Sequence, residues 1–253
     1  MPLSTRSCAP HPSLLEGFLR RLARHPKADA YVLRGGLRLR AWWPHRVARD
    51  VDLVCAGSTD VREDVQRILR TQVPDGIRFD AERIGLVPVR DAAGLRGFRV
   101  VAAGWVDGVG GDLPIDIALG LPLGPGPIRA RLASGRGAAT VWMCRPETQV
   151  ARKLRVLVEP GPERWRPKDL VDLHALTDLS WNRDALAEAL FAAFHEAPHE
   201  HARAQEALAR PQWWVNRGSR AAWRRHLGPR APRLAEVVVK VRDRFVERSG
   251  GWA

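Results

Sequence analysis

The chain has 253 residues and carries 41 Lys and Arg side chains against 28 Asp and Glu, a formal net charge of +13. Hydrophobic residues make up 45% and charged residues 27% of the sequence, which excludes a disordered or collagen-like chain. No apolar run approaches the roughly 18 residues of a membrane span, and the first twelve residues contain no apolar signal region. We therefore expect a folded cytoplasmic protein with no membrane partner.

Cysteine and arginine usage adds two further expectations. The three cysteines, Cys8, Cys55 and Cys144, are too widely spaced for a metal-binding CxxC pair and odd in number, which favours a reducing compartment. Only four basic residues are lysines. The arginine excess has two interpretations, a GC-rich genome or a polyanionic partner whose phosphates need neutralising.

The N-terminal half mixes helix and strand patterns. Apolar residues at helical spacing predict a helix over 13–25, and Ala30–Leu33 predicts a strand that ends in a Gly35–Gly36 turn. A short helix over Leu37–Trp43 and a strand over Asp50–Cys55 follow. Next we expect a helix that is capped within Ser58–Asp60 and runs to Arg70, then four strands, Ile77–Phe79, Leu86–Val89, Phe98–Val106 and Leu113–Leu119.

The second half is predicted to be helical. After the proline- and glycine-rich stretch Leu121–Pro127, the pattern from Pro146 onward is a succession of helices, and Pro146 and Pro167 lie where proline is favoured, in a first helical turn. The expected helices are Pro146–Val158, Pro167–Leu179, Asp184–Phe194, a segment around Gln205, Arg220–Leu227 and Pro232–Val246. We expect a mixed α/β domain over 1–145 and a helical domain over 146–253.

An acidic pair stands out in the stretch Tyr31–Val54. Asp50 and Asp52 are two residues apart on a predicted strand, so their side chains share one face. Two neighbouring carboxylates repel each other unless a cation lies between them, and Mg²⁺ accepts one or two carboxylates together with substrate phosphates. The Gly35–Gly36 turn, placed before a helix, can let backbone N–H groups approach a triphosphate. A bare pair of this kind is more often a solvated strand edge, and the glycine turn reverses that preference.

Other candidate residues lie further along the chain. Asp116 interrupts the apolar strand Leu113–Leu119, either as a third metal-binding carboxylate or as the wet face of an edge strand. Lys153 stands beside an apolar helical stripe, and Asp169 and Asp172 are three apart on one helical face. For these last residues the alternative is a solvated lysine and a carboxylate favoured by a helix N-terminus.

These motifs together resemble the AbiEii/AbiGii toxin family of the nucleotidyltransferase superfamily. The resemblance rests on the Gly35–Gly36 turn, on Arg46 leading into Asp50-x-Asp52, on Ala151–Leu157, which is similar to the family's AxKLxAL segment, and on Lys168–Leu173, which is similar to its KDxxDL segment. It covers most of residues 13–247. The order and spacing of the motifs carry more weight than any one of them.

The resemblance implies a polymerase-β-like nucleotidyltransferase core with a mixed sheet, followed by an all-helical C-terminal domain, in an α+β protein. Carried over residue by residue, it makes Asp50 and Asp52 ligands of Mg²⁺, with Mn²⁺ as an alternative ion, and Asp116 the third carboxylate. It places Gly35, Gly36, Arg46 and Lys153 on the nucleotide and makes Lys153 and Asp169 catalytic. It implies transfer of NMP from an NTP to RNA, such as a tRNA 3′ end, and an antitoxin partner.

The chain departs from the family pattern at two places. Leu37 follows the glycine pair where the family commonly has Ser or Thr, and Ala48 stands two residues before Asp50 where many members have a hydroxyl. A triphosphate-binding hydroxyl is therefore missing, whereas the carboxylates and Lys153 remain, so we expect an active enzyme.

Three functions stay open at this stage. The first is nucleotidyl transfer to RNA by a toxin, the second is nucleotidyl transfer to a small molecule, and the third is non-catalytic binding of nucleic acid by a basic protein. A cluster of arginines over 217–233 favours an RNA partner. Because Arg220 and Arg224 are four apart, they share a helical face and are the predicted RNA-binding residues.

Overall fold

The computed structural model describes residues 11–57, 60–90, 96–162, 164–195, 198–210, 213–229 and 232–249. They fall into two compact units. Unit 1 comprises Met1–Leu121 and Pro127–Cys144, and unit 2 comprises Pro122–Gly126 and Arg145–Ala253. The segment Pro122–Gly126 thus belongs with the helices that follow it, because Thr148 and Arg152 hydrogen-bond to its backbone carbonyls.

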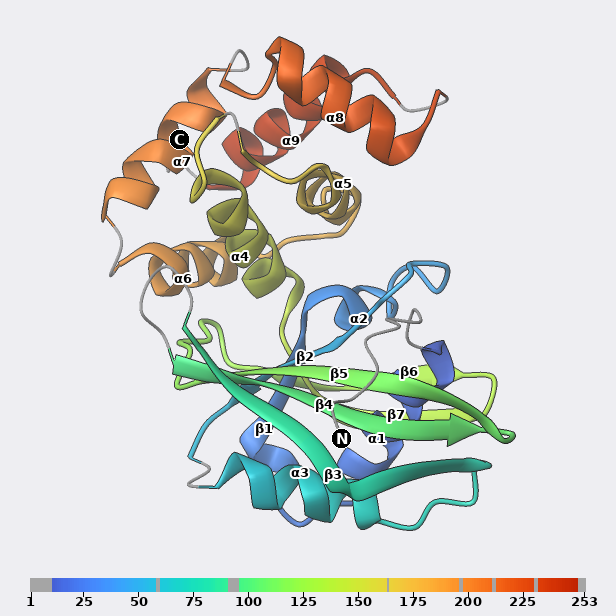
Figure 1. The fold of residues 1–253 in the computed structure, drawn as a ribbon. Helices are drawn as coiled ribbons and strands as arrows, with labels where there is room; N and C mark the ends of the chain where they lie inside the picture. Colours follow the sequence, from blue (N-terminus) through green and yellow to red (C-terminus); the bar gives the residue numbers. More distant parts are fainter. Residues whose placement is uncertain are drawn as a thin grey trace. The chain divides into compact units, whose positions relative to one another are not determined.

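Unit 1 is built on a seven-stranded mixed sheet with the order β3-β4-β5-β2-β1-β7-β6 (Figure 1). The pairs β1–β7 and β2–β5 are parallel, and the other neighbouring strands are antiparallel. The two shortest strands, β1 and β2, therefore lie near the middle of the sheet. The strands are β1 (Tyr31–Arg34), β2 (Val51–Cys55), β3 (Ile77–Arg90), β4 (Arg96–Val106), β5 (Val109–Leu119), β6 (Ile128–Ser134) and β7 (Gly137–Met143).

Helices cover the sheet unequally. The helices α1 (Pro12–Leu22) and α3 (Val61–Arg70) lie on one face, and the short α2 (Gly35–Leu39), which contacts β1 and β2, lies on the other (Figure 1). The hydrophobic core contains Val51, Leu53 and Cys55, which alternate along β2. Since successive strand residues point to opposite faces, this burial turns Asp52 away from the core.

A buried ion-pair cluster ties α1 to the start of β3. Asp75 accepts hydrogen bonds from Arg20 at 2.9 Å and Arg21 at 3.0 Å, and Arg21 also donates to the carbonyl of Ile77 at 2.6 Å. Burial opposes the charged form of Asp75, but the bonds from the two guanidinium groups outweigh it and hold the pKa of this carboxyl below its ordinary value. Both ends of this contact are nearly inaccessible to water.

Unit 2 is entirely helical in its described part. The helix α4 packs against α5, α6 and α7, and buried Arg155 of α4 bonds to Glu200 of α7 at 2.6 Å and to the carbonyl of Ala193. Among the described helices of the chain, none is both long and apolar enough to cross a membrane. The helices are α4 (Pro146–Val158), α5 (Pro167–Leu176), α6 (Arg183–Phe194), α7 (Pro198–Ala209), α8 (Arg217–Leu227) and α9 (Leu234–Ser249).

The structure confirms the predicted α+β class, with corrections to individual elements. The hairpin of β6 and β7 was not predicted, although Leu132, Ala139 and Val141 alternate into the core. The predicted helix Leu37–Trp43 is instead α2, which begins at Gly35. The two strands predicted over Ile77–Val89 are one strand with a register shift between Phe79 and Ile84. Predicted caps Ser58 and Thr59 lie outside the described residues, and Asp60 caps α3 by accepting from the Glu63 N–H.

The Asp75 cluster predicts how the stability of unit 1 responds to acid. A lowered folded-state pKa means that the stabilisation is present above the unfolded pKa of about 3.9 and is lost as pH falls through the folded value. We expect Asp75→Asn to unfold at lower urea concentration at pH 7, because Arg20 and Arg21 lose their partner. The variant should also lose less stability than the wild type between about pH 4 and pH 2. Urea titrations at several pH values measure both effects, and an unchanged acid slope would contradict the assignment.

Candidate active site

Three carboxylates meet on the face of the sheet that carries α2. Asp50 directly precedes β2, Asp52 lies on β2, and Asp116 lies on β5. One carboxylate oxygen from each lies within 4.8 Å of the other two, close enough to hold a metal ion, and all three residues are half-buried. Of the two interpretations of Asp116 left open by the sequence, the geometry fits the third carboxylate, since β5 lies inside the sheet.

The register of the strands places the carboxylates next to each other. Asp52 lies directly opposite Asp116 in the parallel pair β2–β5. On the outer sides of these two residues, Arg99 of β4 is paired with Asp116 and Arg34 of β1 is paired with Asp52. Because directly opposed residues share a face, four neighbouring strands present a row of charges in the order Arg99, Asp116, Asp52, Arg34.

Arg99 makes the closest contact in this row and was not predicted from the sequence. Its Nε donates to Asp116 Oδ1 at 2.8 Å and its Nη2 to Oδ2 at 2.6 Å, so the guanidinium group engages both carboxylate oxygens. The hydrogen bonds and charge of Asp116, with smaller contributions from Asp50 and Asp52, raise the pKa of Arg99 above its ordinary value. The one signal in the sequence was a lone charge in the apolar run 98–102.

Gly35 is required by the position of Asp52. Its φ of +67° is a left-handed conformation that favours glycine, and a Cβ there would lie 2.0 Å from Asp52 Oδ2. Gly36, in contrast, has room for a Cβ, whose nearest neighbour would be Ala48 at 4.0 Å. The two glycines begin α2, so their N–H groups lie in its first turn.

The positions that lack the family's hydroxyls are part of the core. Leu37 and Ala48 are both buried in the hydrophobic cluster of unit 1. Arg46, predicted to contact the nucleotide, is half-buried and hydrogen-bonds to the carbonyl of Val47. Arg38 anchors α2, because its guanidinium stacks on Trp42 at 3.6 Å and bonds to the carbonyl of Cys144 at 2.9 Å, and burial lowers its pKa to about 10.

Lys153 and Asp169 meet within the helical unit. Lys153 Nζ lies 2.7 Å from Asp169 Oδ1 and 2.8 Å from Asp172 Oδ2, and Arg166 also contacts Asp169 at 2.8 Å. Burial disfavours the charged lysine, but the two carboxylates outweigh it and hold the pKa of Lys153 above its ordinary value. Asp172 completes this group, and its spacing from Asp169 on one helical face was the signal for it.

The helix α8 carries a basic surface, which we call the α8 basic face and define by four exposed arginines. They are Arg217, Arg220, Arg224 and Arg225. None of the four forms an ion pair with any residue that the structure describes. A groove of about 840 Å³ runs beside them, and its lining adds Arg233 and buried Trp223. The predicted pair Arg220 and Arg224 thus lines this groove.

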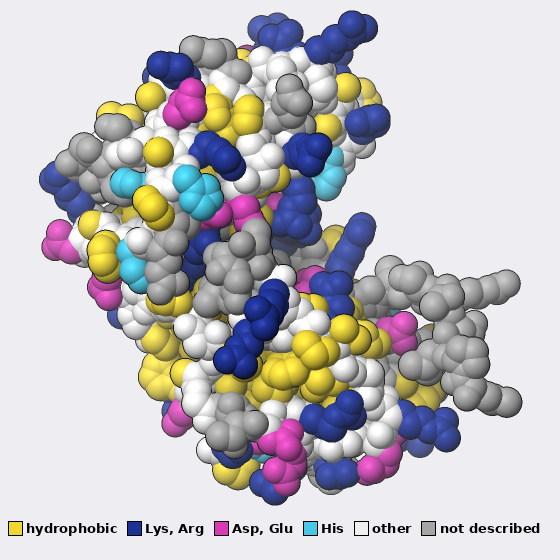
Figure 2. All heavy atoms as spheres, turned by 60° about the vertical axis from the view of Figure 1, so that its left-hand side comes forward, with side chains coloured by type: hydrophobic (Ala, Val, Ile, Leu, Met, Phe, Trp, Pro, Cys, Tyr) yellow, Lys and Arg dark blue, Asp and Glu magenta, His cyan; other side chains and the backbone are white. Residues whose placement is uncertain are grey.

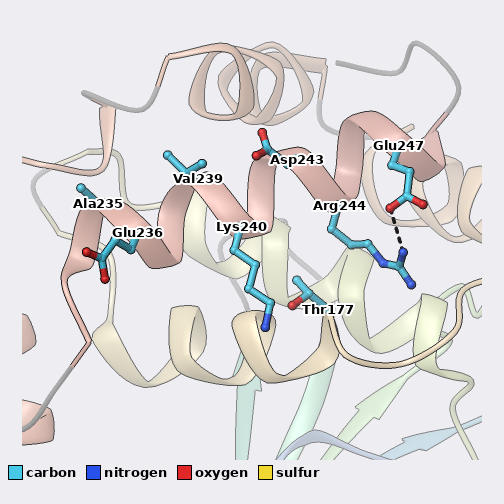
Figure 3. A pocket seen from close by; sticks show the side chains of 8 residues that line it. All are labelled: Thr177, Ala235, Glu236, Val239, Lys240, Asp243, Arg244 and Glu247. Carbon is cyan, nitrogen blue, oxygen red and sulfur yellow. Dashed lines mark hydrogen bonds and ion pairs between the residues drawn. The ribbon is translucent and has the colours of Figure 1, made fainter.

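Some basic residues elsewhere in unit 2 have acidic partners among the described residues, unlike those of the α8 basic face. Lys and Arg are spread over both units on the face seen in Figure 2. A second cavity in unit 2, lined by α9 and Thr177, contains Lys240 and Arg244 (Figure 3). There Arg244 bonds to Glu247 at 2.8 Å, and Lys240 bonds to Asp178 at 2.7 Å. The charges of that cavity are therefore already matched within the chain.

Solved structures show which class of protein has this fold. The chain superposes on the JHP933 protein of Helicobacter pylori with a TM-score of 0.60 and 16% identity, covering 95% of this chain and 90% of the other. It superposes on MenT4, a nucleotidyltransferase toxin of Mycobacterium tuberculosis H37Rv, with a TM-score of 0.50 and 15% identity, covering 92% and 82%. No curated protein matches the chain significantly. The fold is that of nucleotidyltransferases.

The family follows from the sequence match. The model of the nucleotidyl transferase AbiEii toxin family, of type IV toxin–antitoxin systems, matches residues 17–241. The chain belongs to this family, and the resemblance drawn from its motifs is confirmed. It is a nucleotidyltransferase toxin, and membership implies a nucleotide substrate and an antitoxin partner.

The contact between Gly35 and Asp52 predicts different results for the two glycines. Gly35→Ala should lower the free energy of unfolding of unit 1 by about 1–3 kcal/mol, because it places a Cβ at positive φ and against a carboxylate. Gly36→Ala, the matched control, should leave stability unchanged or raise it by up to about 1 kcal/mol, since its backbone is helical and the space is open. Urea denaturation of both variants measures the difference. Equal stabilities would mean that the close approach of Asp52 is wrong.

Proposed function

We propose that this toxin transfers NMP from an NTP to RNA, using a divalent cation held by Asp50, Asp52 and Asp116. The observation that carries the proposal is the cluster of three half-buried carboxylates on and beside neighbouring strands, packed against Gly35 at the start of α2. Such a cluster combines ligands for a hard cation with backbone N–H groups for phosphates.

The donor set fits Mg²⁺ better than a softer metal. All three side chains offer oxygen, the ligand that Mg²⁺ prefers, and no His or Cys belongs to the described group. Mn²⁺ accepts the same ligands. The three negative charges also need a counter-charge, and Arg99 already supplies one at Asp116. When bound, the metal would neutralise charge on the triphosphate and on the leaving pyrophosphate.

The chain's own groups then position the reactants. In the proposed reaction the RNA hydroxyl oxygen bonds to the α-phosphorus while the bond from that phosphorus to the β-phosphate bridge oxygen breaks. Pyrophosphate leaves, and the hydroxyl proton passes to a carboxylate of the cluster. The N–H groups of Gly35 and Gly36 and the guanidinium of Arg46 would bind the triphosphate, because helix N-termini and arginines favour anions.

We assign Lys153 to the nucleotide and Asp169 to the catalytic set, as the family resemblance implies. The support is that Lys153 is a permanent cation near neutral pH, since Asp172 and Asp169 raise its pKa. Both carboxylates are almost fully buried, so the ammonium group is held in one place. Asp172 would act here as a positioning residue for Lys153.

RNA is the acceptor that the charges of unit 2 favour. The α8 basic face has no acidic partner among the described residues, and a row of unpaired arginines suits the phosphates of a nucleic acid. Trp223 is 2% exposed and donates to the carbonyl of Pro232, so it supports α8 and is not available to stack on a base. Cys55 and Cys144 are buried and form no disulfide with another described residue, which agrees with a reducing cytoplasm.

The test of this function is label transfer from α-labelled NTPs to RNA. We expect wild-type protein with Mg²⁺ to label RNA, with tRNA 3′ ends as the first acceptor to try, and Asp52→Asn to reduce the rate roughly 100- to 1,000-fold. The substitution keeps the side-chain shape but removes charge that stabilises the transition state by several kcal/mol. Urea denaturation should show the variant folded. Labelling of small molecules alone, or wild-type activity in the variant, would contradict the proposal.

The α8 basic face predicts a separate effect on the acceptor. Reversing Arg220 and Arg224 to Glu should raise the KM for RNA and reduce its dependence on salt, because fewer phosphate contacts release fewer counterions. Affinity for free NTP should not change. The control reverses two other exposed arginines of unit 2, Arg183 and Arg210, and alters net charge equally. If both double variants modify RNA alike, the α8 basic face does not bind the acceptor.

A further inference from the structure

The contact between Arg99 and Asp116 conflicts with metal binding at the same carboxylate. Both oxygens of Asp116 accept a hydrogen bond from the Arg99 guanidinium, at 2.8 and 2.6 Å. A bidentate pair of this kind occupies one lone-pair position on each oxygen, and a guanidinium repels a divalent cation at close range. Mg²⁺ also demands nearly ideal octahedral geometry at short ligand distances, so a carboxylate that a guanidinium already holds is a poorer ligand for it.

The Arg99 side chain has room to move away from Asp116. Its side chain is 58% exposed, whereas that of Asp116 is 23% exposed, so the long arginine side chain has solvent to move into and the carboxylate is fixed by its strand. Water screens an ion pair with one partner this exposed, which lowers its net strength. The pair can therefore break at low cost when something else binds either partner.

A nucleotide offers Arg99 a replacement. The planar guanidinium fork binds phosphate as readily as carboxylate and through the same two parallel bonds. The row of charges puts Arg99 next to the carboxylates that would hold the metal, and the electrostatic influence of Asp50 and Asp52 reaches it as well. A triphosphate bound with its metal at Asp50, Asp52 and Asp116 would lie within the surroundings of Arg99.

We propose that Arg99 acts as a stand-in cation on Asp116, which it releases for a phosphate group of the incoming nucleotide, so that Arg99 couples nucleotide binding to metal binding. This inference rests on the proposed metal site. It makes Arg99 a positioning residue whose effect is thermodynamic. The site binds a lone divalent ion weakly and binds it well only together with a triphosphate, because each ligand shifts Arg99 in favour of the other.

The experiment measures binding of Mn²⁺ to the full chain by calorimetry and by the loss of the free-ion EPR signal. Each variant is titrated without nucleotide and with an NTP analogue whose α–β bridge is a methylene. We expect Arg99→Gln to bind Mn²⁺ about 10-fold more tightly than wild type without nucleotide, and to gain less from the analogue. The matched control is Arg70→Gln, which removes a similarly exposed arginine paired with Glu82 outside the carboxylate cluster. It should bind Mn²⁺ like the wild type.

Arg99→Lys separates displacement from a general effect of charge. Lysine keeps the positive charge but cannot engage both oxygens of Asp116, so we expect this variant also to bind Mn²⁺ more tightly than wild type without nucleotide. In an Asp116→Asn background, Arg99→Gln should add nothing, which a double-mutant cycle measures as coupling between the two residues. Melting temperatures of the metal-free proteins show that each variant is folded.

Four results would overturn the proposal. Equal or weaker Mn²⁺ binding by Arg99→Gln would make Arg99 a support that holds Asp116 ready for the metal. If Arg99→Lys bound Mn²⁺ with the affinity of the wild type, the effect of Arg99 would come from its positive charge alone. If the wild type bound no Mn²⁺, with or without the analogue, the result would contradict both the proposed metal site and the proposed function. Mn²⁺ binding that needs Asp50 and Asp52 but ignores Arg99 would leave the proposed function intact and reject only the role of Arg99.

Discussion

Electrostatic repulsion among Asp50, Asp52 and Asp116 is the constraint around which unit 1 is arranged. Like charges directly opposite each other in a sheet destabilise it, and here the parallel register of β2 and β5 fixes two of them side by side. The register cannot slip to relieve the repulsion. A shift of one residue would expose Val51 and Leu53 and bury Asp52, which costs far more than the repulsion does. Burial on one face of the sheet therefore holds the charges together on the other.

The same face supplies what makes this repulsion tolerable. Arg99 and Arg34 flank the two opposed carboxylates on the outer strands, and Gly35 leaves space for Asp52 where any other residue would push it away. The carboxylates remain half-buried, so water still reaches them. A site of this kind concentrates negative charge that a divalent cation could bind.

The helical unit also brings two carboxylates together, but there a lysine of the same unit pairs with both. Asp169 and Asp172 are also neighbouring carboxylates, but each side chain is only 2% exposed and Lys153 lies between them. Burying two carboxylates is costly, and Lys153 offsets part of that cost by pairing with both of them, in addition to the contact with a nucleotide that we propose for it. This explains why a lysine occurs at this position of a chain in which most basic residues are arginines. A compact ammonium group can contact both carboxylates from one point, whereas a planar guanidinium is shaped for one.

The sequence was sufficient for local features and insufficient for those that depend on strand register. Strand alternation and the glycine pair pointed to Asp50, Asp52 and Asp116, and helix patterns located most of unit 2. The role of Arg99 was not predictable, because nothing in residues 96–106 reveals that this position lies opposite Asp116 of β5. The β6–β7 hairpin was missed for a related reason. Its alternation is short, and its strand character depends on pairing with β1, a strand about 110 residues earlier in the chain.

Composition in turn overstates how much charge the protein presents to a partner. Arg20, Arg21, Arg38 and Arg155 are all buried, and they bond to carboxylates or to backbone carbonyls. These side chains contribute to the net charge of +13 but act as structural supports, with apolar stems packed in the core and polar ends satisfied. An arginine indicates a polyanionic partner only where the fold leaves it exposed and without an acidic neighbour. The α8 basic face meets both conditions, which is why the geometry of these four residues supports an RNA acceptor when the arginine content alone does not.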